Sequence, residues 1–213
     1  MNTLAQAMDA FYEAFADLAR PRRIATCSCC LDKNQAAPLL STPLRQITSN
    51  DLAPYASSAL LTVGSVSDYL YFLPRILELS ILDGRWGPGV EVIAKAIHST
   101  NPQSWPARRR EALRQLLEQV IDALVEMDGD LTLDGWICAI AIIGFDVAPF
   151  LASIEKHPAA VLLYFEENVH GLKEGKLNNP FWKLPDAGHD LIVQWFKSDA
   201  VRKIAFEAYG YQM

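Results

Sequence analysis

The sequence lacks the features that mark a membrane-spanning or exported protein. Its longest apolar run, Trp136 to Phe145, has ten residues, whereas a membrane-spanning helix needs about 20. No basic segment followed by an apolar core opens the chain, so we expect no signal peptide. We therefore predict a cytoplasmic protein with no membrane partner.

The common sequence signatures of catalysis are also missing. The chain contains no phosphate-binding P-loop, no Gly-x-Gly-x-x-Gly fingerprint and no Gly-x-Ser-x-Gly elbow, and its four histidines form no His-Glu-x-x-His pair. Glu166 and Glu167 are a possible carboxylate pair, but adjacent helical residues diverge by about 100° and would not converge on one substrate. We expect no enzymatic activity and no catalytic residues.

Positive charge is scarce. The chain has 19 Lys and Arg against 25 Asp and Glu, for a net charge of -6, which argues against a nucleic-acid partner. The one basic cluster is Arg108, Arg109 and Arg110 with Arg114, and a solvated helix face is the expected role for it. The acidic balance is compatible with a basic protein partner.

What the chain does have is a group of thiols. Cys27, Cys29 and Cys30 stand within four residues, and the fourth cysteine, Cys138, lies in the apolar run. Zinc prefers four tetrahedral nitrogen or sulfur ligands, so Cys138 or a histidine would have to complete a zinc site. Because Cys138 lies in the apolar run, we expect it to be a small core residue rather than a zinc ligand.

Three interpretations of the cluster stay open. The first is a zinc site, the second is a set of redox-active or reactive thiols, and the third is partly buried free thiols without an ion. We expect the third, and therefore no cofactor. With no export signal, four cysteines are typical of a reducing compartment.

Helical periodicity dominates the rest of the sequence. The apolar spacing and the capping and turn residues predict helices over 3–19, 50–61, 65–82, 88–99, 105–127, 132–143, 146–156, 158–170, 186–197 and 198–209. Ser65 and Asp68 resemble a capping box, and Pro74 should kink the helix that follows. Residues 20–47 carry prolines and the thiols without a clear period, so we expect an irregular segment.

These elements predict an all-α fold in a single domain over 1–213. The helices pair at about 40-residue spacing, as in HEAT-like helical repeats, but no sequence motif repeats between the pairs. An irregular bundle of antiparallel helices and a short solenoid both remain open.

Part of the chain resembles an uncharacterised group of small bacterial proteins. The resemblance covers Cys27 to Leu79 and is carried by Leu52-Ala53-Pro54-Tyr55, by Thr62-Val63-Gly64 and by the helix Asp68-Tyr69-Leu70-Tyr71-Phe72-Leu73-Pro74-Arg75-Ile76-Leu77-Glu78-Leu79, after an N-terminal cysteine cluster. It implies a bacterial, cytoplasmic, helical protein. Orphan helical proteins of this size and acidity are often immunity proteins of toxin systems.

The function expected from the sequence is non-enzymatic protein binding, with a basic toxin domain as the partner. The proposed contact residues are Trp86, Glu166, Glu167, Phe181 and Trp182, because aromatic residues in loops favour partner contacts. The alternative is a zinc- or thiol-dependent enzyme, or a metal-binding protein, that uses Cys27, Cys29 and Cys30.

Overall fold

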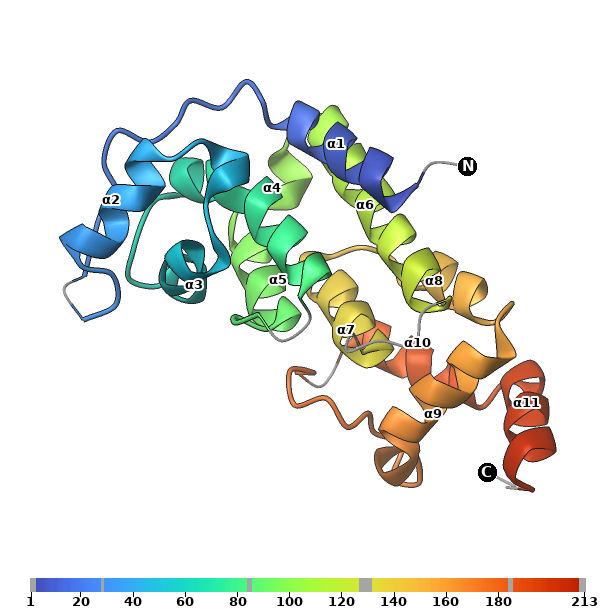
Figure 1. The fold of residues 1–213 in the computed structure, drawn as a ribbon. Helices are drawn as coiled ribbons and strands as arrows, with labels where there is room; N and C mark the ends of the chain where they lie inside the picture. Colours follow the sequence, from blue (N-terminus) through green and yellow to red (C-terminus); the bar gives the residue numbers. More distant parts are fainter. Residues whose placement is uncertain (1–2, 28, 84–85, 127–131, 184–185, 211–213) are drawn as a thin grey trace. The chain divides into compact units, whose positions relative to one another are not determined.

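The computed structural model describes residues 3–27, 29–83, 86–126, 132–183 and 186–210 (Figure 1). These residues form eleven α-helices and two short 3-10 helices. Their only β pairing is an isolated bridge between Ala59 and Val63. The all-α prediction is confirmed.

The helices follow one another with short connections. In chain order they are α1 (Leu4–Ala14), α2 (Lys33–Ser41), η1 (Leu44–Gln46), α3 (Ser49–Ser58), α4 (Val66–Leu82), α5 (Val90–Ser99), η2 (Pro102–Ser104), α6 (Ala107–Leu124), α7 (Leu133–Ile143), α8 (Ala148–Ile154), α9 (Pro158–Leu172), α10 (Ala187–Phe196) and α11 (Asp199–Tyr209). The chain divides by its contacts into two compact units, Met1–Leu116 and Leu117–Met213. That these make one domain stays a prediction.

In the first unit, α4 packs against α1, α3 and α5, and α2 packs against α3. The core holds Tyr55 and Phe72, whose ring centroids are 5.0 Å apart. Ser65 and Asp68 form the capping box that the sequence predicted for α4. Pro74 lies inside α4, and the helix continues past it to Leu82.

Two regions near the start of the chain depart clearly from the sequence prediction. Helix α1 ends at Ala14 rather than near residue 19, and the N–H groups of Phe15 and Ala16 then donate to the carbonyls of Tyr12 and Glu13 in tighter turns. Residues 20–47 contain a helix, α2, where irregular chain was expected. Asp32 accepts the N–H groups of Asn34 and Gln35 while the Gln35 side chain accepts the Asp32 N–H, a reciprocal cap that starts the helix despite Pro38.

In the second unit, α7 is buried along most of its length. Trp136 to Ile140 are all buried, Thr132 caps the helix and Gly144 ends it in the left-handed conformation. Helix α9 packs against α7, α8 and α11, and the Tyr164 ring lies 5.0 Å from Phe196. The later apolar face of α6 is buried from Leu117 to Leu124, as its spacing predicted.

Candidate metal centre

The three clustered cysteines lie on a short turn that is fixed at both ends. Before the turn, the Ala25 carbonyl accepts the Gly64 N–H at 2.9 Å. Within it, the Cys27 carbonyl accepts the N–H groups of Cys30 and Leu31, both at 2.9 Å. Leu31 is fully buried, and the next residue caps α2. These hydrogen bonds bring Cys30 and Leu31 back against Cys27, which places the three thiols together.

Gly64 makes the first of these anchors possible. Its φ of +70° is unfavourable for other residues, and a Cβ there would lie 2.9 Å from the Tyr55 hydroxyl oxygen. A glycine at this position lets the backbone approach both the Tyr55 ring and the extended segment before Cys27. The connection between α3 and α4 thus helps to position the thiols.

The turn brings the three sulfur atoms together. Cys27 Sγ lies 2.9 Å from Cys29 Sγ, and Cys29 Sγ lies 3.5 Å from Cys30 Sγ. All three sulfurs fall within 4.8 Å of one another. Cys29 is exposed and the other two are partly exposed, and all are free thiols. One ion could therefore reach all three sulfurs from solvent.

The thiols differ in acidity because they share hydrogen bonds. The Cys29 thiol and the Cys29 N–H both donate to Cys27 Sγ, with a further bond from Cys30, and this lowers the pKa of Cys27 below its ordinary value. Hydrogen bonds to Cys27 and Cys30 and the charge of those neighbours raise the pKa of Cys29 to about 11. Of Cys27 and Cys29, Cys27 therefore becomes the thiolate more readily, and the thiolate is the form that binds metals.

No further ligand joins the three sulfurs within the described ranges. Among the described residues, the group that could hold an ion contains these three cysteines and no histidine, carboxylate or fourth thiol. Cys138, suggested from the sequence as a fourth ligand, is fully buried in α7, where it acts as a core residue. His189 is buried in the second unit, where its Nε2 accepts the Leu177 N–H at 3.3 Å.

Trp86 does not lie where a partner could contact it. The side chain is 7% exposed, and its indole N–H donates to the Ser49 carbonyl at 3.0 Å. The Gly- and Pro-containing sequence around Trp86 suggested an exposed loop, but the indole packs inward and holds its segment to the start of α3. This burial favours a packing role for Trp86, and its assignment as a contact residue stays a prediction.

The paired glutamates on α9 have different environments. Glu166 is exposed and accepts the Tyr209 hydroxyl hydrogen. Glu167 is partly buried and accepts the Asp134 N–H at 3.0 Å. Burial, together with the neighbouring Asp134 carboxylate, raises the pKa of Glu167 to about 7. Glu166 remains available to a partner, whereas Glu167 belongs to an internal polar network.

Phe181 and Trp182 are both partly exposed. The Phe181 N–H donates to Asn179 Oδ1 at 2.9 Å, and the Trp182 ring packs edge-on against His189 at 5.8 Å between centroids. The Trp182 indole nitrogen is buried without a hydrogen-bond partner among the described residues. Much of the Trp182 side chain therefore serves to pack the loop before α10.

A buried amide network was missed at the sequence level. Asn168 is fully buried and donates to both Asp134 Oδ1 and the Tyr164 carbonyl. The side-chain oxygen of Asn168, Oδ1, accepts the Asn178 N–H at 2.8 Å. Through Asn168, the loop after α9 is therefore linked to Asp134 on α7. An Asn on a helix is ordinarily expected to face solvent, so only the apolar residues one helical turn away, Tyr164, Phe165 and Leu172, could have indicated its burial.

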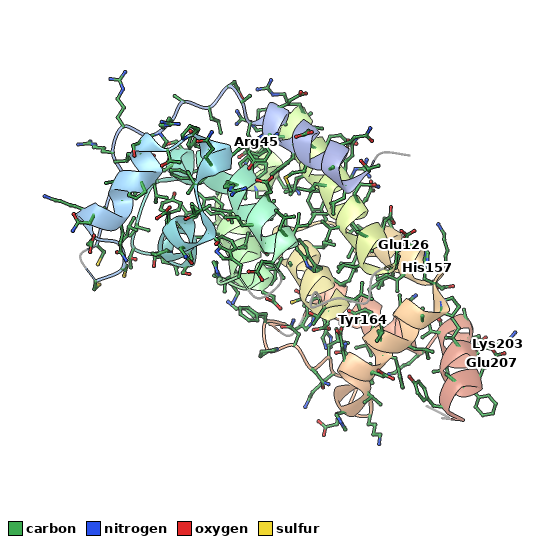
Figure 2. All side chains as sticks on the ribbon, viewed as in Figure 1. Arg45, Glu126, His157, Tyr164, Lys203 and Glu207 are labelled. Carbon is green, nitrogen blue, oxygen red and sulfur yellow. The ribbon has the colours of Figure 1, made fainter. Side chains whose placement is uncertain are left out.

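The arginine cluster is largely neutralised by local pairing. Arg108 and Arg109 both bind Asp17, at 2.6 and 2.8 Å, and Arg114 binds Glu111. Arg45 follows the same pattern, pairing with Asp9 while its guanidinium lies 3.8 Å from the Tyr12 ring centroid (Figure 2). Lys203 and Glu207 approach to 3.9 Å across one turn of α11. These contacts favour structural roles over anion binding.

No protein-family model, curated protein or solved structure matches the chain. The resemblance of Cys27–Leu79 to a bacterial group therefore stays a prediction. Among the described helices, none combines the length and the apolar character needed to cross a membrane.

Proposed function

We propose that the protein binds one thiophilic metal ion through Cys27, Cys29 and Cys30. The observation that carries this proposal is the convergence of three sulfur atoms within 4.8 Å on an anchored turn. Thiolates are soft ligands and select soft or borderline ions such as Cu(I) and Zn(II), and Cd(II) is a soft ion that reports on such a site.

The anchors around the turn make ion binding favourable. A ligand set that is already assembled costs less ordering entropy than one on a flexible chain. The turn is held by the Gly64–Ala25 bond, by the buried Leu31 and by the α2 cap. An ion would replace the thiol protons, so its apparent affinity should rise with pH.

Cadmium titration tests the proposal directly. The protein is reduced, separated from reductant without oxygen and titrated with Cd(II), and the ultraviolet sulfur-to-cadmium charge-transfer absorption is recorded. We expect saturation at one ion per chain for the native protein. The Cys27→Ser/Cys29→Ser double variant should lose this absorption.

The matched control is Cys138→Ser, which removes one thiol from the core of the second unit and should leave the titration unchanged. Equal absorption in the native protein and the double variant, or no saturable absorption in either, would contradict the proposal. Circular dichroism of each variant establishes that the fold is retained.

A protein partner, in particular a basic toxin domain, remains a second proposal. Large exposed side chains on α11 favour it, since Phe206 is 51% and Tyr209 49% exposed, and exposed aromatic residues are enriched where proteins bind one another. Of the contact residues proposed from the sequence, Glu166 is exposed, and Glu167, Phe181 and Trp182 are partly exposed. The net charge of -6 would speed association with a basic partner and make binding weaken with salt.

Co-expression with the product of a neighbouring gene tests this second proposal. An immunity protein should co-purify with the toxin and protect the host cell. Phe206→Ser should weaken the complex, whereas Lys203→Ser, at an exposed polar position on the same helix, should not. Failure both to co-purify and to protect would remove the immunity hypothesis and leave the metal-binding proposal intact.

A further inference from the structure

We propose that the Cys27–Cys29–Cys30 centre selects a trivalent thiophilic ion of the arsenite class, held by three sulfurs with no fourth ligand. The inference rests on the proposed metal-binding function and goes further by naming the ion class. It follows from the number of ligands, from their spacing and from the charge balance of binding.

The number of ligands is the first argument. Tetrahedral structural zinc requires four protein ligands, and the described residues supply three sulfurs and no fourth group. Asp32 is the nearest carboxylate in the sequence, but its Oδ1 accepts the N–H groups of Asn34 and Gln35 at the start of α2. A trivalent ion with a lone pair is complete with three sulfurs in a pyramid.

Spacing is the second argument. With a zinc–sulfur bond of about 2.3 Å, tetrahedral coordination places the sulfurs about 3.8 Å apart. Two of the three sulfur separations, Cys27–Cys29 at 2.9 Å and Cys29–Cys30 at 3.5 Å, are shorter, and all three lie within 4.8 Å. A pyramidal ion draws its sulfurs closer together than a tetrahedral one does, because the lone pair compresses the bond angles. The two short separations on either side of Cys29 therefore fit the pyramidal ion with the smaller rearrangement.

Charge balance is the third argument. Arsenous acid, As(OH)₃, reacts with three thiols to form three As–S bonds and release three water molecules. Each thiol proton leaves with one hydroxide of the acid, no electron is transferred, and the product is neutral. Zinc bound by three thiolates would instead leave a net negative charge on a chain whose formal charge is already -6.

Native mass spectrometry of the full chain tests the stoichiometry. The protein is reduced with a phosphine, desalted without oxygen, and mixed with sodium arsenite. We expect one arsenic per chain, with a mass increase that corresponds to the loss of three protein protons. An adduct that has displaced only two protons would overturn the inference, since it would show an ordinary dithiol adduct.

Single variants and competition complete the test. Cys27→Ser, Cys29→Ser and Cys30→Ser should each weaken arsenite binding at least about tenfold, or about 1.4 kcal/mol, while Cys138→Ser should not. Equimolar Zn(II) should fail to displace the arsenic. If any of the three single variants binds as tightly as the native protein, three-sulfur coordination is excluded.

Two negative outcomes of these experiments distinguish the ion class from the metal-binding function itself. If Zn(II) displaces arsenite and is lost in the cysteine variants, the inference falls but the proposed metal-binding function stands. If neither arsenite, Zn(II) nor Cd(II) binds the reduced protein, both fall together.

Discussion

The two regions of the chain that contain cysteine differ in the solvent exposure of the thiols and in how closely the thiols approach one another. Cys27, Cys29 and Cys30 share a polar turn in the first unit, reach solvent and approach one another within hydrogen-bonding distance. Cys138 in the second unit is fully buried in α7 among Trp136, Ile137 and Ile140. The same side chain is therefore a potential ion ligand in one region and a small apolar residue in the other.

The comparison shows what fixes the role of a thiol. In α7 the helical period places Cys138 on a buried face of an apolar helix. In the turn, backbone hydrogen bonds to the Cys27 carbonyl bring consecutive residues to the same side. Burial removes reactivity, whereas convergence creates it.

The largest expected effect is a loss of stability in the buried helix α7, which contains Cys138. Ile140→Ala, two residues along α7, should lower the free energy of unfolding by about 2–5 kcal/mol, because it leaves a cavity in a fully buried site. Leu61→Ala, at a side chain that is 79% exposed, should change stability by no more than about 0.5 kcal/mol. Chemical denaturation measures both; equal effects would contradict the assignment of α7 to the core.

The next prediction replaces the thiols themselves. Cys138→Ser should cost about 1–3 kcal/mol, because the hydroxyl is placed in an apolar core. Cys29→Ser should stay within about 0.5 kcal/mol, because that side chain is exposed. Urea unfolding at one pH under reducing conditions measures both, and a larger loss at Cys29 would reverse the proposed roles.

Removing the cap of α2 tests how the thiol turn is held. Asp32→Ala should lower stability by about 0.5–2 kcal/mol, since two N–H groups lose their acceptor. It should also weaken Cd(II) binding, because the cap fixes the chain after Leu31. Lys33→Ala, an exposed change at the next residue, is the control. Unchanged stability and Cd(II) affinity in Asp32→Ala would show that the turn is held without the cap.

The smallest expected effect is a pH dependence in the second unit. Glu167 has a folded pKa of about 7, above the ordinary value of about 4.3, so the folded state holds this proton more tightly than the unfolded state. The resulting stabilisation is complete below about pH 4 and is lost as the pH rises through 7. Because Glu167 is partly exposed, we expect a loss of no more than about 1 kcal/mol.

Glu167→Gln should remove this loss. Its stability relative to the native protein should be greater at pH 8 than at pH 5, as measured by urea unfolding at both values. Glu166→Gln makes the same chemical change at the exposed neighbour and should retain the native pH profile. A flat native profile between pH 4 and 8, or an identical change in both variants, would contradict the account of Glu167.

The regular helices were predictable because their signals are local. The apolar spacing of α6, the Ser65–Asp68 capping box of α4 and the Thr132 cap of α7 each depend on a few neighbouring residues. Helix α2 was missed because Pro38 and the thiols suggested irregular chain, although Asp32 and Gln35 carry a local capping signal.

The site depended on contacts that no local pattern encodes. The clustering of three cysteines was visible in the sequence, but their convergence requires the turn fixed by Gly64 and Leu31. Trp86 looked like a surface residue until its indole was placed against the Ser49 carbonyl. Asn168 likewise gains its role from Asp134 and Asn178, which lie 34 and 10 residues away.

The number of sulfur atoms around a bound ion tests the metal-binding account most directly. X-ray absorption at the arsenic or cadmium edge of the loaded, reduced protein counts the neighbours of the ion. The account predicts three sulfurs around one ion per chain in the native protein and in Cys138→Ser, and fewer in Cys29→Ser. A first shell of oxygen or nitrogen atoms, or a sulfur count that Cys29→Ser leaves unchanged, would contradict it.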